Sequence, residues 1–350
     1  MTLADFLESE IETGSFPGGA ALVGSGEAVV ESAAAGNATV LPQAAALSGE
    51  TLFDLASLTK PLATGALFAQ ARLDLGSPPG RFFPEWKATR YDGITLEHLL
   101  THTSGLPAWY PLYARGEGAL AYRRTLATIE PVEPPGSRVI YSDLNFLLLG
   151  DLLELHYAAA LDRAFERLVA GPAGSGARFL PPDPEGTAAT ERGDATERRM
   201  TEELGLSYPH FRAGVVRGEV HDGNAFRRGG VAGNAGLFGT ARDVWALART
   251  WLEAGRDGLA EDRTPHLPEA RGLSWQGKRG SGSAVAEMSD HAFGHTGFTG
   301  TSVWIEPERD RIAVLLTNRV HPEVKPGNFH EVRRRFQAVV CRGGWSRCGS

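Results

Sequence analysis

Apolar residues repeat with two different periods along the chain, and each period indicates a different kind of element. Residues 2–14 carry apolar side chains at helical spacing, which predicts a short amphipathic helix that ends at the turn SFPGG. The segment GGAALVGSGEAVVESAAAG, residues 18–36, predicts a β-hairpin of small residues around the turn GSGE. Near the other end, residues 300–319 predict a second hairpin that turns through PERD, and residues 329–340 predict a closing helix.

The middle of the chain is mainly helical in pattern. Helices are predicted over residues 58–74, 95–101, 118–128, 143–170 and 241–254. The stretch 181–205 is polar and aperiodic, so we expect a long surface loop there. The arrangement predicts an α/β fold of the α+β kind, with an antiparallel sheet formed from both termini, flanked by helices, and an inserted, mainly helical lobe. We assign residues 1–65 and 285–350 to the sheet domain and residues 66–284 to the inserted domain.

Composition and charge narrow the class of ligand. With 350 residues, of which 42% are hydrophobic and 22% charged, the chain can bury a sizeable core. A net charge of −7 and the absence of a basic cluster interleaved with aromatic residues argue against a nucleic-acid partner and favour small molecules. The start, MTLADFLESEIETG, has no basic or apolar signal region, and no apolar run reaches the ~20 residues that span a bilayer. We therefore expect a cytoplasmic protein without membrane association, and its oligomeric state stays open.

Lysine is rare in this chain, and one of the four lysines stands three residues after a serine. Of 35 basic residues 31 are arginine, which cannot lose its proton in a protein, whereas a lysine can act as a base. In FDLASLTKPLATG, residues 53–65, Ser57 and Lys60 share one face of a predicted helix. Pro61 is tolerated in the first turn of that helix and so places Ser57 near its N-terminus. The pair is either an activated nucleophile with its base or an accident of spacing.

Two further segments carry candidate chemistry. In IYSDLNFLLLG, residues 140–150, a strand-like Ile-Tyr enters an apolar helix through Ser142 and Asp143. Taken alone, Tyr141 is a half-buried aromatic residue and Asp143 a helix cap. In FGHTGFTGT, residues 293–301, a Gly-rich segment leads into a strand, and His295 taken alone is incidental.

The three segments together carry a family resemblance. The order SLTK, YSD and HTG resembles the SxxK, YxN and [KH]TG signature of the serine β-lactamase and penicillin-binding-protein superfamily, and is most similar to its class C β-lactamase-like esterases and carboxypeptidases. Residues 99–113 and 218–243 also resemble segments of that superfamily, so the resemblance covers nearly the whole chain. It implies a β-lactamase/DD-peptidase-like fold with the active site between the sheet and the helical lobe.

The resemblance also implies roles for individual residues. Ser57 is expected to be the acyl-forming nucleophile, while Lys60 and Tyr141 share the work of general base and general acid. The backbone N–H groups of Ser57 and Phe298 are expected to form the oxyanion hole. His295 and Thr296 are expected to line the strand edge beside the substrate, and Gly297 is expected to let the substrate approach this edge closely.

Two positions depart from the commonest pattern of the superfamily. Asp143 replaces the asparagine of YxN, so an amide that can donate a hydrogen bond becomes a carboxylate that only accepts when ionised. Such a carboxylate would hold Lys60 protonated and leave more of the base role to Tyr141. His295 replaces the lysine of KTG, which removes a permanent cation and favours neutral esters. Arg227 and Arg228 could supply that charge, but we interpret them as solvated surface arginines.

Three functions are therefore weighed. The leading hypothesis is a serine hydrolase that works through an acyl-enzyme at Ser57 on a small-molecule ester or amide, specifically a carboxylic-ester hydrolase. The alternatives are a β-lactamase or D-alanyl-D-alanine carboxypeptidase, and a catalytically silent ligand-binding protein on the same fold. No GxSxG motif occurs, which excludes the α/β-hydrolase nucleophile elbow.

No metal or organic cofactor is implied by the sequence. His98 and His102 have i, i+4 spacing but lack the glutamate of HExxH and a third ligand, so we expect them to cap a helix or face the core. Cys341 and Cys348 are too few and too close to the end of the chain for a disulfide framework or a zinc site.

Overall fold

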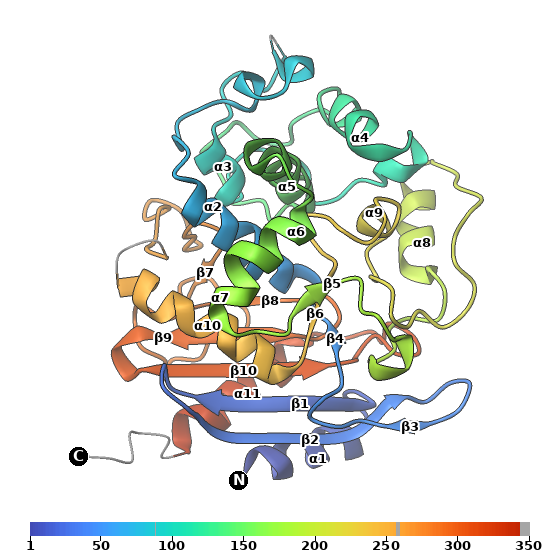
Figure 1. The fold of residues 1–350 in the computed structure, drawn as a ribbon, viewed down its shortest axis with the longest axis vertical. Coiled ribbons are helices and arrows are strands. Elements are labelled where there is room, and N and C mark those ends of the chain that lie inside the picture. Colours follow the sequence, from blue (N-terminus) through green and yellow to red (C-terminus); the bar gives the residue numbers. More distant parts are fainter. Residues whose placement is uncertain (88, 257–259, 344–350) are drawn as a thin grey trace.

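The computed structural model describes residues 1–87, 89–256 and 260–343, in which a seven-stranded antiparallel sheet stands beside a helical lobe (Figure 1). The strand order of the sheet is β3-β2-β1-β10-β9-β8-β7. Its strands are β1 (Gly18–Gly24), β2 (Val29–Thr39), β3 (Ala45–Ala46), β7 (Gln276–Gly277), β8 (Phe293–Thr296), β9 (Ser302–Glu306) and β10 (Arg311–Thr317). Both predicted hairpins are present, as β1–β2 and β9–β10.

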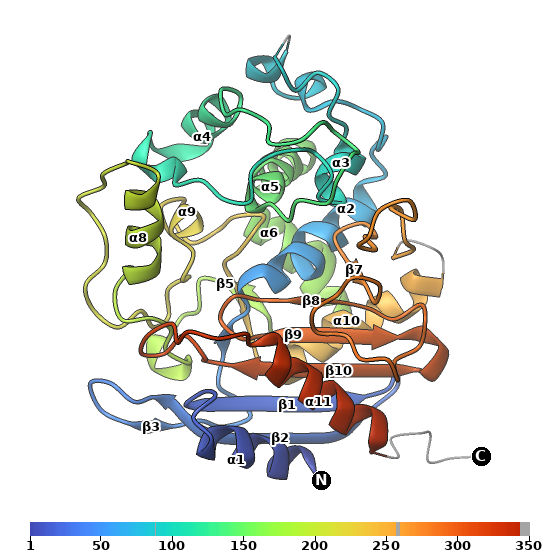
Figure 2. The same cartoon turned by 180° about the vertical axis from the view of Figure 1, so that it is seen from behind.

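The two ends of the chain meet in the middle of this sheet, where β1 pairs antiparallel with β10 and Ala20 faces Leu316. Side chains alternate between the two faces of each strand, as the two-residue period requires. Ala21, Val23 and Leu315 pack on one face with helices α1 (Leu3–Glu12) and α11 (His330–Arg342), which Figure 2 shows lying across that face. The predicted terminal helices are thereby confirmed, and they cover the outer face of the sheet.

Helix α10 (Ala241–Arg256) covers the opposite face of the sheet, where Leu22, Val314 and Leu316 join the main core. Contacts between α10 and strands β1, β9 and β10 therefore tie this helix to the sheet, although it falls within residues 66–284. The predicted domain boundaries stay a prediction.

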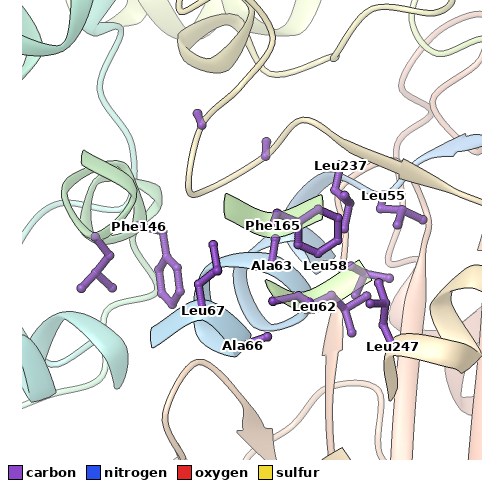
Figure 3. Packing of buried hydrophobic residues seen from close by; sticks show 14 of the residues in the cluster. Leu55, Leu58, Leu62, Ala63, Ala66, Leu67, Phe146, Phe165, Leu237 and Leu247 are labelled. Carbon is purple, nitrogen blue, oxygen red and sulfur yellow. The ribbon is translucent and has the colours of Figure 1, made fainter. Parts of the chain in front are cut away.

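The helical lobe holds the remaining helices, which pack around the buried helical segment that begins at Lys60. These are α2 (Ala66–Ala71), α3 (Leu96–Leu100), α4 (Gly118–Leu126), α5 (Asp143–Tyr157), α6 (Leu161–Phe165), α7 (Gly171–Ala173), α8 (Ala195–Glu203) and α9 (Gly223–Phe226). A π-helical turn, Lys60–Gly65, runs directly into α2, so the helix predicted from residue 58 begins near the expected position despite Pro61. Figure 3 shows its apolar side chains, among them Leu62 and Leu67, enclosed by Phe146, Phe165 and Leu247.

The single helix predicted over residues 143–170 is wrong in its extent. Ala158 adopts a left-handed conformation with φ of 48°, which ends α5, and the chain restarts as α6 at a different angle. The apolar pattern continues across the break because Leu161 and Phe165 also reach the core. Among the described residues, no single helix is long and apolar enough to cross a membrane, and only the pair α5 and α6–α7, bent by 72°, has the required length and composition.

The surface loop predicted over residues 181–205 is also wrong, because it contains α8. The buried positions of α8 are Thr196, Glu197 and Thr201, all of them polar, so no apolar period reveals the helix in the sequence. A small sheet of order β4-β6-β5 joins this region to the rest of the lobe. Its strands are β4 (Phe53–Asp54), β5 (Arg178–Phe179) and β6 (Leu237–Gly239).

Helix α5 touches the loop before β6 at a point where only glycine fits. A Cβ atom at Gly150 would lie 2.8 Å from the backbone nitrogen of Gly233 and 2.9 Å from its Cα. Gly233 is held from the other side by a 2.7 Å hydrogen bond from Thr64 Oγ1 to its carbonyl. Neither backbone can move away without disturbing the core.

We predict that Gly150→Ala lowers the free energy of unfolding by about 1 to 3 kcal/mol through overpacking, measured by urea denaturation. Gly49→Ala is the matched control, because a Cβ at Gly49 meets nothing within 4 Å. Equal stabilities of the two variants would contradict the close approach of α5 to this loop.

Candidate active site

Ser57 and Lys60 lie where β4 ends and the buried helix begins. Ser57 sits in the 3₁₀ turn Ala56–Leu58, and Lys60 Nζ donates a 2.9 Å hydrogen bond to Ser57 Oγ. Ala56 has φ of 47°, an unfavourable value for a residue with a side chain, and such backbone strain is often concentrated at functional sites. The spacing that the sequence predicts therefore does bring the lysine and the serine into contact.

The Lys60 side chain is fully buried and surrounded by acceptors. Its ammonium group lies 2.6 Å from Asp143 Oδ1 and donates a 3.1 Å hydrogen bond to the carbonyl of Asn234. Burial alone would lower the pKa of Lys60, but the charge of Asp143 and the contact with Tyr141 outweigh it and raise that pKa above its ordinary value. The resting site therefore holds an ammonium ion against the nucleophile.

Tyr141 lies just before α5, with its ring centroid 5.0 Å from Lys60 Nζ. Its hydroxyl is buried and has no hydrogen-bond partner of good geometry among the described residues. Burial raises the pKa of Tyr141 and the Lys60 cation opposes that rise, with a net upward shift. The hydroxyl is thus a neutral proton donor beside a cation that would stabilise its phenolate.

The end of β8 closes the site from the side of the sheet. Gly297 packs so tightly that a Cβ there would lie 2.7 Å from the carbonyl of Leu55. Thr299 Oγ1 donates a 2.8 Å hydrogen bond to the carbonyl of Asp54, and Thr301 Oγ1 donates a 3.0 Å bond to that of Leu55. The turn after β8 is therefore fastened to the residues that precede Ser57.

This fastening leaves two backbone donors close to the nucleophile. Neither the N–H of Ser57 nor that of Phe298 forms a backbone or side-chain hydrogen bond within the described part of the chain. Free N–H groups held in a rigid turn are the kind of donors that stabilise an oxyanion.

His295 and His102 lie in the interior behind Tyr141. Their ring centroids are 5.8 Å and 4.5 Å from that of Tyr141. Burial lowers the pKa of His295 far below its usual range, and the positive charges of Lys60 and Arg271 lower it further. His295 is therefore neutral at physiological pH and does not replace the cation of a KTG lysine.

The expectation that His98 and His102 cap a helix or face the core is confirmed. His98 Nδ1 accepts the N–H of Thr95 at the start of α3, and His102 Nδ1 accepts the N–H of Ser142 just before α5. Of the two cysteines, Cys341 lies in α11 next to Arg311, and Cys348 lies outside the described residues.

A cavity of about 470 Å³ opens over these groups. Except for Lys60, which lies behind Ser57, every predicted site residue lines it: Ser57, Tyr141, Asp143, His295, Thr296, Gly297 and Phe298. Residues missed in the sequence also line it, namely Glu197, Asp222 and Asn234 together with Arg271, Arg319 and Arg333. Glu197 comes from α8, Asp222 and Asn234 lie before and after α9, Arg271 precedes β7, and Arg319 and Arg333 follow β10. Asp222 and Asn234 fall within the family-like segment 218–243, but no local motif singled out any of these residues.

The interpretation of Arg228 as a solvated arginine is wrong. Its side chain is 8% exposed and forms ion pairs with Asp151 and Glu154. Arg227 is half-buried and stacks on Tyr208 with its guanidinium carbon 5.0 Å from the ring centroid. Neither arginine lines the cavity, so positive charge reaches it from elsewhere in the chain.

Comparison with known proteins places the chain in a class, the serine hydrolases. The chain belongs to the Beta-lactamase family, whose sequence model it matches over residues 3–335. A provisionally named D-alanyl-D-alanine carboxypeptidase of Salmonella enteritidis PT4 (strain P125109) is 30% identical over 329 residues, covering 83% of this chain and 76% of the relative. The N-acetylmuramyl-L-alanine amidase of Bacillus subtilis (strain 168) is 30% identical over 370 residues, covering 92% and 82%.

The predicted fold is confirmed by solved structures. EstCE1, described as a hydrolase with promiscuous acyltransferase activity, superposes with a TM-score of 0.70 at 20% identity, covering 95% of this chain and 96% of its own. A class C β-lactamase from Rhodobacter sphaeroides superposes with the same TM-score of 0.70 at 19% identity, covering 96% and 97%.

The ion pair between Lys60 and Asp143 leads to a prediction about pH. Serine attack needs a base, so the Lys60–Tyr141 pair must first lose a proton, and the charge of Asp143 holds that proton in place. We predict that Asp143→Asn moves the acidic limb of the kcat/KM profile for p-nitrophenyl butyrate to lower pH by roughly 1 to 3 units.

Asp290→Asn serves as the control for this prediction, because Asp290 also pairs with a lysine, Lys278 at 3.2 Å, but its side chain is 94% exposed. Its pH profile should coincide with that of the wild type. An unshifted limb in Asp143→Asn would contradict the dominance of Asp143 over the protonation of Lys60.

Proposed function

We propose that the protein is a carboxylic-ester hydrolase that works through an acyl-enzyme at Ser57. The observation that carries this proposal is the 2.9 Å hydrogen bond between Ser57 Oγ and a fully buried Lys60, with two free backbone N–H groups beside it. A buried lysine next to a serine is costly to maintain unless its charge serves a purpose.

In the proposed reaction, the Lys60–Tyr141 pair first loses one proton to solvent, which leaves a Tyr141 phenolate beside the Lys60 ammonium ion. Ser57 Oγ then attacks the ester carbonyl carbon and passes its proton to this phenolate. The carbonyl oxygen becomes an oxyanion that accepts hydrogen bonds from the N–H groups of Ser57 and Phe298. The C–O bond of the ester then breaks, the pair returns the proton to the departing alkoxide, and water hydrolyses the acyl-serine by the same steps. Proton transfer of this kind is typically worth ~10²- to 10⁴-fold in rate, and one oxyanion donor about 3 to 4 kcal/mol.

Tyr141 is the group we assign to the proton transfer itself. Asp143 holds Lys60 as an ammonium ion, which cannot accept a proton but stabilises a phenolate 5.0 Å away from its nitrogen. Lys60 then acts electrostatically, and the proton moves between Ser57 and Tyr141.

Two features of the site favour esters over peptides. The carboxylate of Asp143 can only accept hydrogen bonds, so it offers no donor to an amide carbonyl of a peptide substrate. His295 is neutral and buried, so this position on the strand edge presents no positive charge to a substrate carboxylate.

One observation nevertheless supports a D-alanyl-D-alanine carboxypeptidase as a second candidate. Arg319 and Arg333 line the cavity and have no carboxylate partner among the described residues. Arg333 is 5% exposed, its Nε has no hydrogen-bond partner, and burial together with Arg319 lowers its pKa to about 9. Two guanidinium groups without counter-charges suit a substrate carboxylate.

The ester hypothesis is tested by comparing the purified protein with Ser57→Ala. We expect the wild type to hydrolyse p-nitrophenyl butyrate and Ser57→Ala to lose at least about 10³-fold in kcat for this ester. Both proteins are expected to cleave a chromogenic cephalosporin only slowly. Absence of Ser57-dependent ester turnover would refute the proposal, while rapid Ser57-dependent cephalosporin cleavage would favour a β-lactamase.

The second candidate is separated from the first by a peptide assay. A carboxypeptidase would release D-alanine from diacetyl-L-lysyl-D-alanyl-D-alanine. Because Arg319 would bind the carboxylate of this peptide, Arg319→Gln would raise KM for the peptide roughly tenfold and would change KM for the neutral ester much less. Arg309→Gln is the control, since Arg309 is 44% exposed and lies outside the cavity. No release of D-alanine by the wild type would exclude this candidate.

A further inference from the structure

Two carboxyl groups on one side of the cavity lack the arginine partners that this chain usually provides. Several other buried carboxylates are paired, for example Asp194 with Arg212 at 2.7 Å and Asp151 with Arg123 at 3.0 Å, whereas both oxygens of buried Asp54 accept backbone N–H groups instead. Glu197 of α8 and Asp222 just before α9 line the cavity, and neither has a cationic partner within 4 Å among the described residues.

The two carboxyl groups keep acceptor capacity toward the cavity. Asp222 Oδ1 accepts the N–H of Ala225 at 2.7 Å and the Asn234 side chain also lies close enough to bond this carboxylate, which still leaves free lone pairs on its two oxygens. Glu197 accepts from the N–H of Gly223 at 2.6 Å and from the hydroxyl of Tyr113 at 2.9 Å, and both donors lie on the side of the protein. Burial and the neighbouring Asp222 raise the pKa of Glu197 above its ordinary value, and the nearby His221 only partly opposes this rise.

Asn234 provides an independent indication of a ligand. It is 1% exposed, lines the same cavity, and its side-chain Oδ1 has no hydrogen-bond partner in the part of the chain that the structure describes. A buried acceptor without a donor is costly, so a donor from a ligand is expected there. Asn234 also lies beside the nucleophile, because its carbonyl accepts from Lys60 Nζ at 3.1 Å.

We propose that Asp222, Asn234 and Glu197 form a subsite for a protonated amine of the substrate, so that the enzyme acts on esters or amides that carry an ammonium group close to the reacting carbonyl. This inference rests on the proposed function and adds the substrate class. An ammonium group has three donors and one positive charge, which match the remaining acceptor sites of Asp222, the Oδ1 atom of Asn234 and the carboxyl pair without an ion-pair partner within 4 Å among the described residues.

Arginines that line the same cavity narrow the substrate class further. Phe298 contacts both groups of residues: the ring of His221, next to Asp222, stacks on it at 5.5 Å between centroids, and the guanidinium carbon of Arg319 lies 5.0 Å from its centroid. The cavity therefore holds both carboxyl groups and guanidinium groups. A substrate that carries an amine and an anionic group could use both.

The test compares two inhibitors of the same length that differ in charge. Hydrolysis of p-nitrophenyl butyrate is measured in the presence of either n-butylammonium or 1-butanol as a competitive inhibitor. Because neither compound contains a scissile bond, the comparison is valid whichever side of that bond the substrate amine occupies. We expect the wild-type inhibition constant to be roughly 10- to 100-fold lower for n-butylammonium, and Asp222→Asn to remove most of this preference.

Asp222→Asn keeps a good N-terminal cap for α9, because asparagine caps helices as well as aspartate does. If that variant fails to fold, Glu197→Gln decides the question, since glutamine keeps an acceptor for the N–H of Gly223. Glu219→Gln is the matched control: Glu219 is 53% exposed, lies on the same segment and is absent from the cavity lining, so the preference should persist.

Failure of this inference can be told apart from failure of the proposed function. Ester turnover with equal inhibition by both compounds, or an ammonium preference that survives in Asp222→Asn and Glu197→Gln, overturns the amine subsite and leaves the esterase proposal standing. Absence of ester turnover overturns the esterase proposal. In that case, binding of n-butylammonium and 1-butanol is compared by ligand-observed NMR in the wild type and Asp222→Asn. A preference for n-butylammonium that is lost in Asp222→Asn supports the amine subsite, and equal binding of the two compounds overturns it.

Discussion

The buried ion pair between Lys60 and Asp143 is the interaction on which the rest of the site depends. A lone ammonium group in this interior would lose its proton, because burial disfavours charge. The carboxylate at 2.6 Å reverses that tendency and fixes an ammonium ion beside Ser57 Oγ. The stabilisation of a Tyr141 phenolate and the direction of proton transfer follow from the presence of this cation, which also adds to the effect of burial in keeping His295 neutral.

Three separate parts of the chain must be held rigidly for this pair to survive. The helix that carries Lys60 is enclosed by the core, α5 presents Asp143 at its first turn, and the loop before β6 supplies the carbonyl of Asn234. Glycines let these parts approach: Gly150 and Gly233 bring α5 against the loop, and Gly297 brings the end of β8 against Leu55. The position of Ser57 is therefore determined by backbone packing as much as by its own contacts.

The sheet, most helices and the Ser57–Lys60 pair could be predicted because each leaves a local pattern in the sequence, whereas the role of Tyr141 followed only from the family resemblance. Two hairpins show clear turns, and the SxxK spacing places two side chains on one helix face. Helix α8 left no such pattern, since its buried face is made of threonine and glutamate. Arg319, Arg333 and Asp222 were missed for a related reason: they meet only through tertiary packing, and a lone arginine or aspartate looks like a surface residue in a sequence.

The pairing of β1 with β10 has a consequence for how the protein matures. Ala20 and Leu316 are neighbours in the sheet although almost the whole chain lies between them, so they can pair only after the C-terminal part of the chain has been synthesised. The turn that presents Phe298 lies between β8 and β9, in the same late-synthesised part of the chain. An incompletely synthesised chain would thus hold its serine and lysine on one helix but lack the turn that faces them, so hydrolytic activity would appear only once the final strands have docked.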